Sequence, residues 1–309
     1  RAMEGCFSRR QQVATTTKLP ESPSPLHAVE QLLTQLGAQS ICHEKSLNEV
    51  LSVHLKSGGS RVRAQLTLDM GEQLGLPERV CVPLAAAIEG LHQASLIHDD
   101  LLDEDRSRRG VPSVWYQEGS ATAVCLGDAL ISQAYELLTQ IEGITHAQLV
   151  ALIRAFNEGV TAMAAGQSLD CQWSTGLTLS YADYEQAVRH KSGPLLGLPI
   201  ALPLALARGY DARTRTVLNV AMDIGIAYQL ADDFDDREDD QGVHLNGFWI
   251  LVEETGSIEA AERALRVLFD GYIDDAMAAL DILPRPCQAI VQGLIGRLYQ
   301  KYPSLQKVA

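Results

Sequence analysis

Apolar residues recur mainly three and four positions apart along this chain, from His27 onward. This spacing places them on one face of an α-helix, whereas the strict alternation typical of half-buried strands is nearly absent. Glycine and proline mark the breaks between the periodic segments. The pattern therefore predicts about ten or more helices and no sheet of consequence. The expected helices cover residues 26–36, 47–55, 61–74, 79–103, 121–141, 146–170, 181–189, 195–207, 211–236, 258–281 and 284–299.

The composition adds a fold class to this pattern. Hydrophobic residues make up 46% of the 309 residues and aromatic residues only 6%, which predicts an all-α protein with an aliphatic core. No interior stretch is rich in proline, glycine and serine, so we expect one domain, covering residues 26–309. Residues 1–25 are polar and end in the sequence ESPSP, and we expect them to form a flexible N-terminal tail.

Charge and cysteine usage exclude several classes of protein. A net charge of −14 argues against nucleic-acid binding, which needs clustered lysine and arginine. The six cysteines are dispersed and form no CxxC pair, as is typical of free thiols in a reducing compartment, so we predict a cytoplasmic location. No apolar segment reaches about 18 residues without a charge or a proline. The best one, Leu198 to Ala207, is short, so we expect no transmembrane segment.

Two aspartate clusters share the spacing DDxxD, from Asp99 to Asp103 and from Asp232 to Asp236, each at the end of an apolar helical stretch. Residues i and i+4 lie on one face of a helix, so each cluster presents two carboxylates in one direction. Like charges at this spacing destabilise an isolated helix by roughly 0.2–0.5 kcal/mol per pair, which favours a compensating cation. Ligands that are all oxygen select hard divalent metals, chiefly magnesium.

A single acidic run is more often a solvated helix end than a metal site. Here two matched copies occur, and the paired arginines Arg108 and Arg109 follow the first copy closely. His92 also falls on the same helical stripe as Asp99 and Asp103, which favours a position facing a cavity over a position in the core. These features together indicate a metal–diphosphate site.

Further short motifs follow the first cluster in a fixed order. They are HQASLIHDDLLDEDRSRRG, CLGDALIS, AAGQSLD, HKSG and YQLADDFDD. In this order and spacing the chain resembles the trans-isoprenyl diphosphate synthases of the polyprenyl synthetase family, and the geranylgeranyl diphosphate synthases in particular. The resemblance runs from Gly58 to about Asp236. It implies an isoprenoid-synthase-type helical bundle around a central cavity, and it suggests a homodimer.

The resemblance also implies a reaction, the condensation of isopentenyl diphosphate with an allylic diphosphate. Magnesium, with three ions per active site, would neutralise the leaving pyrophosphate. The double bond of isopentenyl diphosphate would then attack the allylic cation, and a proton would be lost. The implied metal ligands are Asp99, Asp100, Asp103, Asp232, Asp233 and Asp236. The implied catalytic residues are Asp99, Asp103, Asp232, Lys191 and Gln229.

The implied substrate-binding residues are Arg63, His92, Arg108, Arg109 and Ser192. Arg108 would hold the allylic diphosphate, whereas Arg63, His92 and Arg109 would hold isopentenyl diphosphate. Guanidinium groups suit this role because their paired N–H donors match phosphate oxygens.

Product length in this family depends on the bulk of the side chains four and five positions before the first DDxxD. Ser95 and Ala94 occupy those positions, and Leu91 lies one helical turn deeper as the candidate floor of the pocket. Small side chains leave the pocket open beyond fifteen carbons, so geranylgeranyl diphosphate is the predicted product. A longer polyprenyl product remains an alternative, as does a simple packing role for the small residues.

Two positions depart from the family pattern. Ser60 stands in the sequence GGSRVR where the family element GGKxxR has a lysine that would contact isopentenyl diphosphate. No lysine occurs between residues 236 and 253, where the family usually has a lysine-containing loop. Arg237, His244 and Asn246 are the candidate replacements.

These departures leave two alternatives open. The first is a class I terpene cyclase-like enzyme that ionises one substrate, which the lost lysine favours and the retained Arg63, His92 and Arg109 oppose. The second is a non-catalytic regulatory subunit of a prenyl synthase. Six matched aspartates argue against a regulatory subunit, because it has no need for intact metal ligands.

Overall fold

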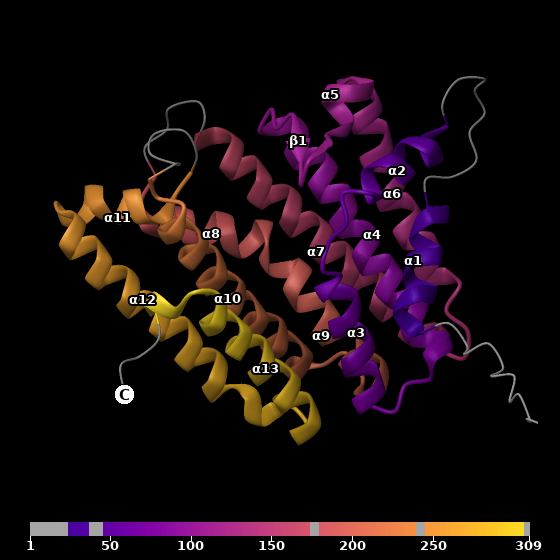
Figure 1. Cartoon of the computed structure of the whole chain (residues 1–309). Helices are drawn as coiled ribbons and strands as arrows, with labels where there is room; N and C mark the ends of the chain where they lie inside the picture. The colour runs from indigo at the N-terminus through magenta and orange to yellow at the C-terminus, as the bar shows by residue number, and fades with distance from the viewer. Residues whose placement is uncertain (1–23, 37–45, 174–178, 239–244, 306–309) are drawn as a thin grey trace, which may run out of the picture.

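The computed structural model describes residues 24–36, 46–173, 179–238 and 245–305, which form an all-α bundle (Figure 1). The expected tail of residues 1–25 lies almost entirely outside these ranges. The α-helices are α1 (Pro25–Gln35), α2 (Leu47–Leu55), α3 (Val62–Gln73), α4 (Glu78–Leu102), α5 (Val114–Glu118), α6 (Ser120–Thr139), α7 (His146–Trp173), α8 (Tyr181–Lys191), α9 (Gly193–Arg208), α10 (Ala212–Asp235), α11 (Gly247–Thr255), α12 (Ile258–Ala278) and α13 (Arg285–Lys301). Two short 3-10 helices, η1 (Leu280–Ile282) and η2 (Pro303–Leu305), and two strands, β1 (Ser107–Arg108) and β2 (Val111–Pro112), complete the described elements.

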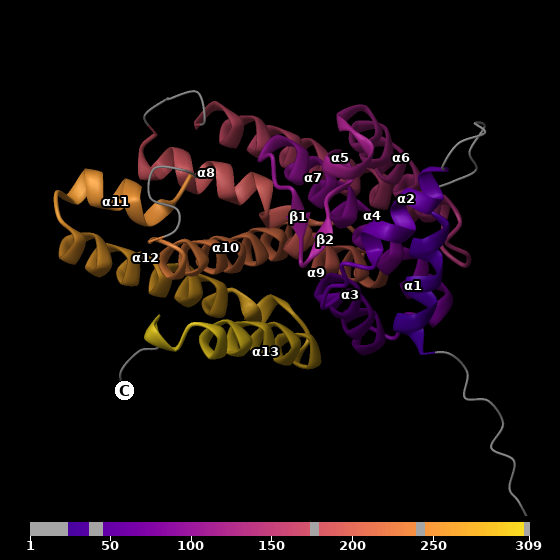
Figure 2. The same ribbon diagram turned by 45° about the horizontal axis from the view of Figure 1, so that its top comes forward.

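The all-α fold predicted from the sequence is confirmed, and every predicted helix is present with its ends within a few residues of the prediction. The prediction missed α5, α11 and the antiparallel β1–β2 hairpin that follows the first aspartate cluster (Figure 2). The signals for α11 were nevertheless present in the sequence. The Asn246 side chain caps its first turn by accepting from the N–H groups of Phe248 and Trp249, and Gly256 ends it in a left-handed conformation.

Helix α9 lies at the centre of the bundle, because almost all of its sixteen residues are buried. Leu198 and Leu202 belong to a core shared by α1, α4, α6 and α7. Ile200 and Leu204, on another face of α9, belong to a second core shared by α8, α10, α12 and α13. A helix that is apolar on every side has to be surrounded by other elements. Both aspartate-bearing helices, α4 and α10, accordingly pack against α9.

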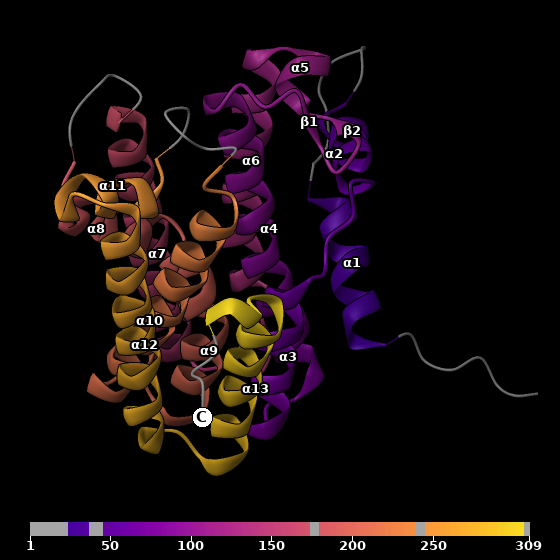
Figure 3. The same cartoon turned by 60° about the vertical axis from the view of Figure 1, so that its left-hand side comes forward.

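The long helices run roughly side by side in the bundle (Figure 3). By length and composition α4 could cross a membrane, with a mean hydropathy of 1.4 over an 18-residue window. The search for apolar segments without a charge did not find this window, because the window contains Glu89. However, 78% of the window is buried inside the protein, as is typical of a core helix.

Gly166 of α7 allows the chain to bring Lys191 close to the aspartates. A Cβ atom built on Gly166 would lie 2.2 Å from the backbone nitrogen of Lys191, which is too close for any other residue type. The two helices therefore approach at this point because Gly166 has no side chain.

We predict that Gly166→Ala lowers the midpoint of thermal unfolding, with a loss of about 1–3 kcal/mol in the free energy of unfolding, because the backbone at Lys191 has to move away. The matched control is Gly296→Ala in α13, where the added Cβ would meet no other side chain or helix within 4 Å. That variant should gain roughly 0.5–1 kcal/mol from improved helix propensity. Equal midpoints for the two variants in calorimetry would contradict the close packing of α7 against residue 191.

Candidate active site

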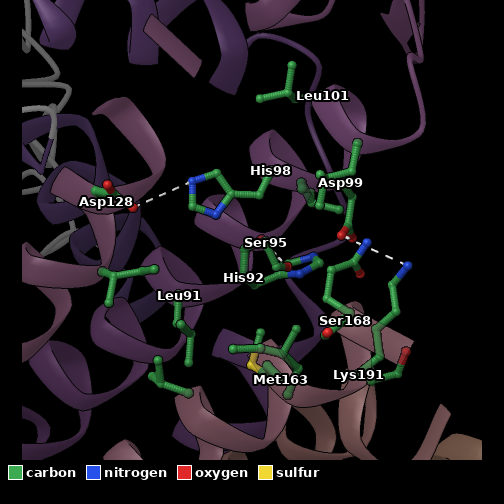
Figure 4. A pocket seen from close by; sticks show the side chains of 18 of the residues that line it. Leu91, His92, Ser95, His98, Asp99, Leu101, Asp128, Met163, Ser168 and Lys191 are labelled. Atoms are coloured by element: carbon green, nitrogen blue, oxygen red, sulfur yellow. Dashed lines mark hydrogen bonds and ion pairs between the residues drawn. The ribbon is translucent and has the colours of Figure 1, made fainter. Parts of the chain in front are cut away.

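A cavity of about 680 Å³ lies between α4, α6 and α7 and reaches the junction of α8 and α9 (Figure 4). This volume is within the range of about 300–1,000 Å³ that is typical of small-molecule sites. Most of its wall is apolar, with leucines, Val160 and Met163, while Asp99 and Lys191 face each other at one side. A smaller cavity of about 210 Å³ shares Lys191 and Ser192 with it. The arrangement suits a molecule with a long apolar part and a charged head.

Asp99 is the carboxylate of the first cluster that faces the main cavity. Its Oδ1 lies 4.0 Å from the Lys191 ammonium, which also binds Asp170. Burial raises the pKa of Asp99 to about 6, although the charge of Lys191 acts in the opposite direction. For Lys191, burial alone would lower the pKa. The negative charges of Asp99 and Asp170 outweigh this effect, so the pKa of Lys191 is raised overall. Lys191 therefore stays charged beside the aspartates.

The second aspartate of each cluster is buried and hydrogen-bonded within the protein. Asp100 accepts from Nε and Nη2 of Arg108 at 3.0 and 2.5 Å. Asp233 accepts from the Tyr184 hydroxyl at 2.7 Å, from Gln229 Nε2 at 2.8 Å and from the Gly247 N–H at 2.7 Å. Each of these two carboxylates thus fixes its own helix end to neighbouring elements.

The two clusters lie across one cavity from each other. Asp103, at the end of α4, and Asp233, near the end of α10, both line the smaller cavity together with Lys191, Ser192 and Gln229. No group of three or more His, Cys, Asp or Glu side chains within the described ranges is arranged to hold a metal ion by itself. Magnesium fits such a site nonetheless, because it is usually held by one or two carboxylates plus substrate phosphates and water.

Asp232 makes contacts that the sequence did not predict. Its Oδ1 accepts hydrogen bonds from the Tyr302 hydroxyl at 2.5 Å and from the Lys301 ammonium at 3.0 Å. Lys301 also donates to the Tyr228 hydroxyl at 2.7 Å. The C-terminal helix α13 therefore contributes to the second aspartate cluster. No motif pointed to Lys301, because it lies 65 residues beyond the cluster and in no recognisable pattern.

Arg63 and His92 form a second polar group on the cavity wall. Arg63 Nη1 lies 3.3 Å from His92 Nε2. Burial lowers the pKa of His92 well below its usual value, and the charges of Arg63, Arg108, Arg61 and Arg109 lower it further, so the ring is neutral at pH 7. Because a guanidinium can only donate, His92 Nε2 accepts and the ring proton is on Nδ1. Nδ1 is buried and has no partner among the described residues.

A glycine pair shapes the segment beside these residues. Gly58 and Gly59 both have positive φ angles, and Arg109 Nη1 donates to the Gly58 carbonyl at 3.0 Å. A Cβ atom on Gly59 would lie only 3.0 Å from Arg109 Nη1. Arg61 fixes the segment to α4 by an ion pair with the buried Glu89 at 3.3 Å. Four arginines (Arg61, Arg63, Arg108 and Arg109) are thus close enough to His92 to affect its pKa.

Of the three residues predicted to set product length, two line the main cavity and one lies in the core. Leu91 and Ser95 line the main cavity. Ala94 is completely buried in the core and is not part of the cavity wall. The expectation that Ala94 keeps the cavity open thus receives no support from this geometry. Positions 95 and 91 are four residues apart, so they share the helix face that is turned to the cavity.

Arg237 and Asn246, two of the candidate replacements for the lysine of the family's loop, both make other contacts in the structure. The Arg237 guanidinium stacks over Phe234, 4.3 Å from the ring centroid, and donates to the Phe234 carbonyl. Asn246 caps α11 and also donates to the Asp233 carbonyl at 2.8 Å. His244 lies outside the described residues, and Ser60 is exposed.

The profile of the Polyprenyl synthetase family matches residues 44–244, which is more than half of the chain. The chain belongs to the polyprenyl synthetase family. The predicted family and the predicted enzyme class, a prenyltransferase, are therefore confirmed. The curated relatives include the farnesyl diphosphate synthase of Haemophilus influenzae, which is 39% identical over 204 residues, covering 64% of this chain and 69% of the relative.

Two further similarities extend over more of the chain. The farnesyl diphosphate synthase of Geobacillus stearothermophilus is 35% identical over 265 residues, covering 76% of this chain and 89% of the relative. The solved structure of a geranylgeranyl pyrophosphate synthetase from Geoglobus acetivorans has a TM-score of 0.74 and 26% identity, covering 89% of this chain and 97% of that one. These relatives bear names for different products, so the similarity establishes a prenyl diphosphate synthase family without fixing the product.

We predict that Asp99→Asn raises the stability of this synthase at pH 7.5 by at most about 3 kcal/mol, at 1.36 kcal/mol per pKa unit. The pKa of Asp99 is raised from 3.8 to about 6 in the folded protein. The unfolded chain therefore releases this proton at lower pH than the folded protein does. As the pH rises from about 4 to about 6, the wild type consequently loses stability. An uncharged amide escapes this loss.

The measurement for Asp99→Asn is the unfolding midpoint of wild type and variant from pH 4 to pH 8. Their difference should be small near pH 4 and should reach its full value above pH 6. Asp235→Asn, at an exposed position of the second cluster, is the control and should give nearly the same difference at every pH. A pH-independent difference for Asp99→Asn would show that its carboxylate carries no burial cost.

Proposed function

We propose that this protein is a magnesium-dependent prenyltransferase that condenses isopentenyl diphosphate head-to-tail with an allylic diphosphate, with geranylgeranyl diphosphate as its main product. The observation that carries the proposal is the joint placement of two aspartate clusters and a deep apolar cavity. Asp99 borders the apolar cavity, and Asp103 and Asp233 border the smaller cavity that adjoins it. A charged diphosphate and a long hydrocarbon tail would thus be bound side by side.

Magnesium suits the carboxylate oxygens of this site. The first and last aspartates of each cluster (Asp99, Asp103, Asp232 and Asp236) would hold it, and three ions per active site are expected from the family. Asp100 and Asp233 are instead assigned to positioning, because both are buried and hydrogen-bonded to neighbouring elements. Bound magnesium supplies neutralisation of the pyrophosphate leaving group.

Two groups of polar residues, each containing at least one cation, would bind the two diphosphates. Lys191, Ser192 and Gln229 line the small cavity between the clusters, which suits the allylic diphosphate. Arg108 is assigned to the same substrate. Arg63 and His92 line the main cavity, and the guanidinium of Arg63 suits an anion because it carries several N–H donors and a fixed positive charge. With Arg109 they are assigned to isopentenyl diphosphate.

The reaction needs no nucleophilic side chain. The carbon–oxygen bond of the allylic diphosphate breaks, and the bonding electrons leave with pyrophosphate. The double bond of isopentenyl diphosphate forms the new carbon–carbon bond to the allylic cation, and a proton is then lost to the released pyrophosphate. The apolar wall of the main cavity excludes water, which would otherwise capture the cation. A homodimer, a cytoplasmic location and a single catalytic domain over residues 26–309 are part of the same proposal.

The test of this function is product analysis by mass spectrometry with magnesium, labelled isopentenyl diphosphate and, separately, dimethylallyl, geranyl and farnesyl diphosphates. We expect a labelled twenty-carbon diphosphate. Asp99→Ala and Asp232→Ala should each lower turnover at least roughly a thousandfold, because the leaving group loses its neutralisation, while the helical circular dichroism is retained.

Other outcomes separate the alternatives. A hydrocarbon or alcohol without label would indicate a terpene cyclase-like enzyme, for which the replacement of the family lysine by Ser60 is the supporting observation. No turnover, together with no thermal stabilisation by magnesium and pyrophosphate, would indicate a regulatory subunit. Near-normal activity of either aspartate variant would refute the metal assignment.

We also predict opposite changes in product length from two residues on the same wall of the main cavity. Ser95→Phe should shift the main product to fifteen carbons or fewer, because the ring would fill the space close to Asp99. Leu91→Ala should shift it to longer products, because Leu91 lies one turn deeper and its removal extends the cavity. Unchanged product lengths in both variants would show that the hydrocarbon tail grows elsewhere.

A further inference from the structure

Glu89 is a buried carboxylate close to the cations of the site, and the reaction proposed above gives it no role. It lies on α4, three residues before His92, and is only 2% exposed. Its Oε1 accepts from Arg61 Nη1 at 3.3 Å and from Gln93 Nε2 at 2.9 Å. Neither Glu89 nor Arg61 lines either of the two cavities described above. A buried charge is costly unless it is paired and hydrogen-bonded, so these contacts keep Glu89 ionised in the protein.

Gln93 fixes the orientation of the Glu89 carboxylate. Because the amide nitrogen of Gln93 donates to Glu89, its Oε1 faces His54 of α2 and lies 3.0 Å from His54 Nε2. Burial lowers the pKa of His54, so the ring is neutral and its proton is on Nε2, which donates to Gln93. Both side chains are buried. The carboxylate therefore belongs to a hydrogen-bonded chain that joins α2, α4 and the start of α3.

Arg61 has a strained backbone. Its φ angle is 49°, in the left-handed region that residues other than glycine rarely adopt. Arg61 directly precedes α3, and its carbonyl accepts the first helical hydrogen bond, from the Gln65 N–H at 2.9 Å. Its side chain is only 9% exposed and is paired with Glu89. The ion pair thus stabilises the turn from which α3 starts, two residues before Arg63.

The same turn also contacts Arg109. A Cβ atom on Gly59 would lie 3.0 Å from Arg109 Nη1 and 3.4 Å from Arg61 Nη1, so both guanidinium groups approach this glycine. Arg109 Nη1 also donates to the Gly58 carbonyl at 3.0 Å. Arg63 and Arg109, both assigned to isopentenyl diphosphate, are therefore connected to Glu89 through the turn of residues 58–61.

The charge of Glu89 has the wrong sign for direct binding of a diphosphate. A carboxylate near an anion site repels the anion, and the low dielectric of the interior strengthens this repulsion. Its geometric effect is favourable, because it holds Arg61 and the turn in place. Glu89 also counteracts the effect of burial on Arg63, whose pKa burial lowers. The two effects of Glu89 on anion binding are thus opposite in sign, and an experiment can separate them.

We propose that Glu89 is a positioning residue of this enzyme, which holds the turn of residues 58–61 through Arg61 so that Arg63 and Arg109 can bind the diphosphate of isopentenyl diphosphate. Glu89 itself does not contact the substrate, since it is buried and lines neither cavity. The inference rests on the proposed function, because it assumes that isopentenyl diphosphate is a substrate. Placing binding groups before the substrate arrives lowers the cost of ordering them on binding.

The experiment is calorimetric titration of isopentenyl diphosphate into the full-length protein without an allylic partner, so that no turnover occurs. Glu89→Gln keeps the shape of the side chain and removes its charge. It should weaken binding roughly fivefold or more, because Arg61 loses its charge-assisted partner. If the charge of Glu89 acted only by repulsion, the same variant would bind more tightly. Unchanged or tighter binding would therefore overturn the inference.

Glu30→Gln is the matched control. Glu30 is the other carboxylate near Arg61, with Oε1 3.8 Å from Arg61 Nε, but its side chain is 49% exposed. Exposed ion pairs contribute little, so this variant should change the affinity less than about twofold. A loss equal to that of Glu89→Gln would show that burial of the carboxylate is irrelevant and would overturn the inference.

A double-mutant cycle tests whether Glu89 acts through Arg61. Arg61→Asn removes the guanidinium but keeps a residue type that adopts the left-handed conformation more readily than most. It should weaken binding as Glu89→Gln does, and the double variant should bind within about twofold of the weaker single variant. Additive losses would overturn the connection through Arg61. If Glu89→Gln does not fold, the comparison of Arg61→Asn with Glu30→Gln decides the inference.

Steady-state kinetics separate positioning from a general structural effect. Glu89→Gln should raise KM for isopentenyl diphosphate, while KM for geranyl diphosphate and kcat stay within about twofold of the wild type. Equal effects on both substrates, together with a lower kcat, would show a merely structural role and would overturn the inference.

Failure of the proposed function gives a different result. If the wild type binds isopentenyl diphosphate but does not elongate an allylic diphosphate, the proposed function is wrong, and the binding data for the variants still decide the inference. If the wild type elongates and the Glu89 and Arg61 variants bind isopentenyl diphosphate as it does, only the inference is wrong. If the wild type does not bind isopentenyl diphosphate, both are overturned.

Discussion

Helix α9 has to be buried on every side, and this constraint sets the positions of both aspartate clusters. Its leucines and isoleucine belong to two different cores, one on each side. Helices α4 and α10 pack against it from these two sides. Their acidic C-terminal ends thereby face a common cavity. The hydrophobic effect, which carries no information about carboxylates, thus places the groups that the proposed chemistry requires.

The site is electrostatically unfavourable for the protein without substrates. Burial disfavours the charged form of both groups, so it raises the pKa of Asp99 and lowers the pKa of His92. Buried donors of Arg63 and His92 lack partners among the described residues. Such costs are typical of functional sites, where stability is given up for binding and catalysis. Magnesium ions bound at Asp99 would offset the burial of its charge.

The mouth of the site depends on parts of the chain that no motif marks. Lys301 and Tyr302 lie beyond the matched family region, which ends at residue 244, and yet both bind Asp232. Helix α11 likewise fixes Asp233 through the Gly247 N–H. The C-terminal helices therefore do more than cover the second core. They hold the second cluster in position and, through Lys301, bring a cation to it.

The sequence by itself determined the helices, the family and the two aspartate clusters, because helical periodicity and motif spacing are local properties. It also identified Arg63 and His92, although 29 residues separate them. Only the tertiary structure decided which aspartate of each cluster is buried, that Ser95 lines the cavity while Ala94 does not, and that Lys301 lies beside Asp232. These outcomes depend on how distant helices pack, and no short-range pattern encodes the distance between residues 232 and 301.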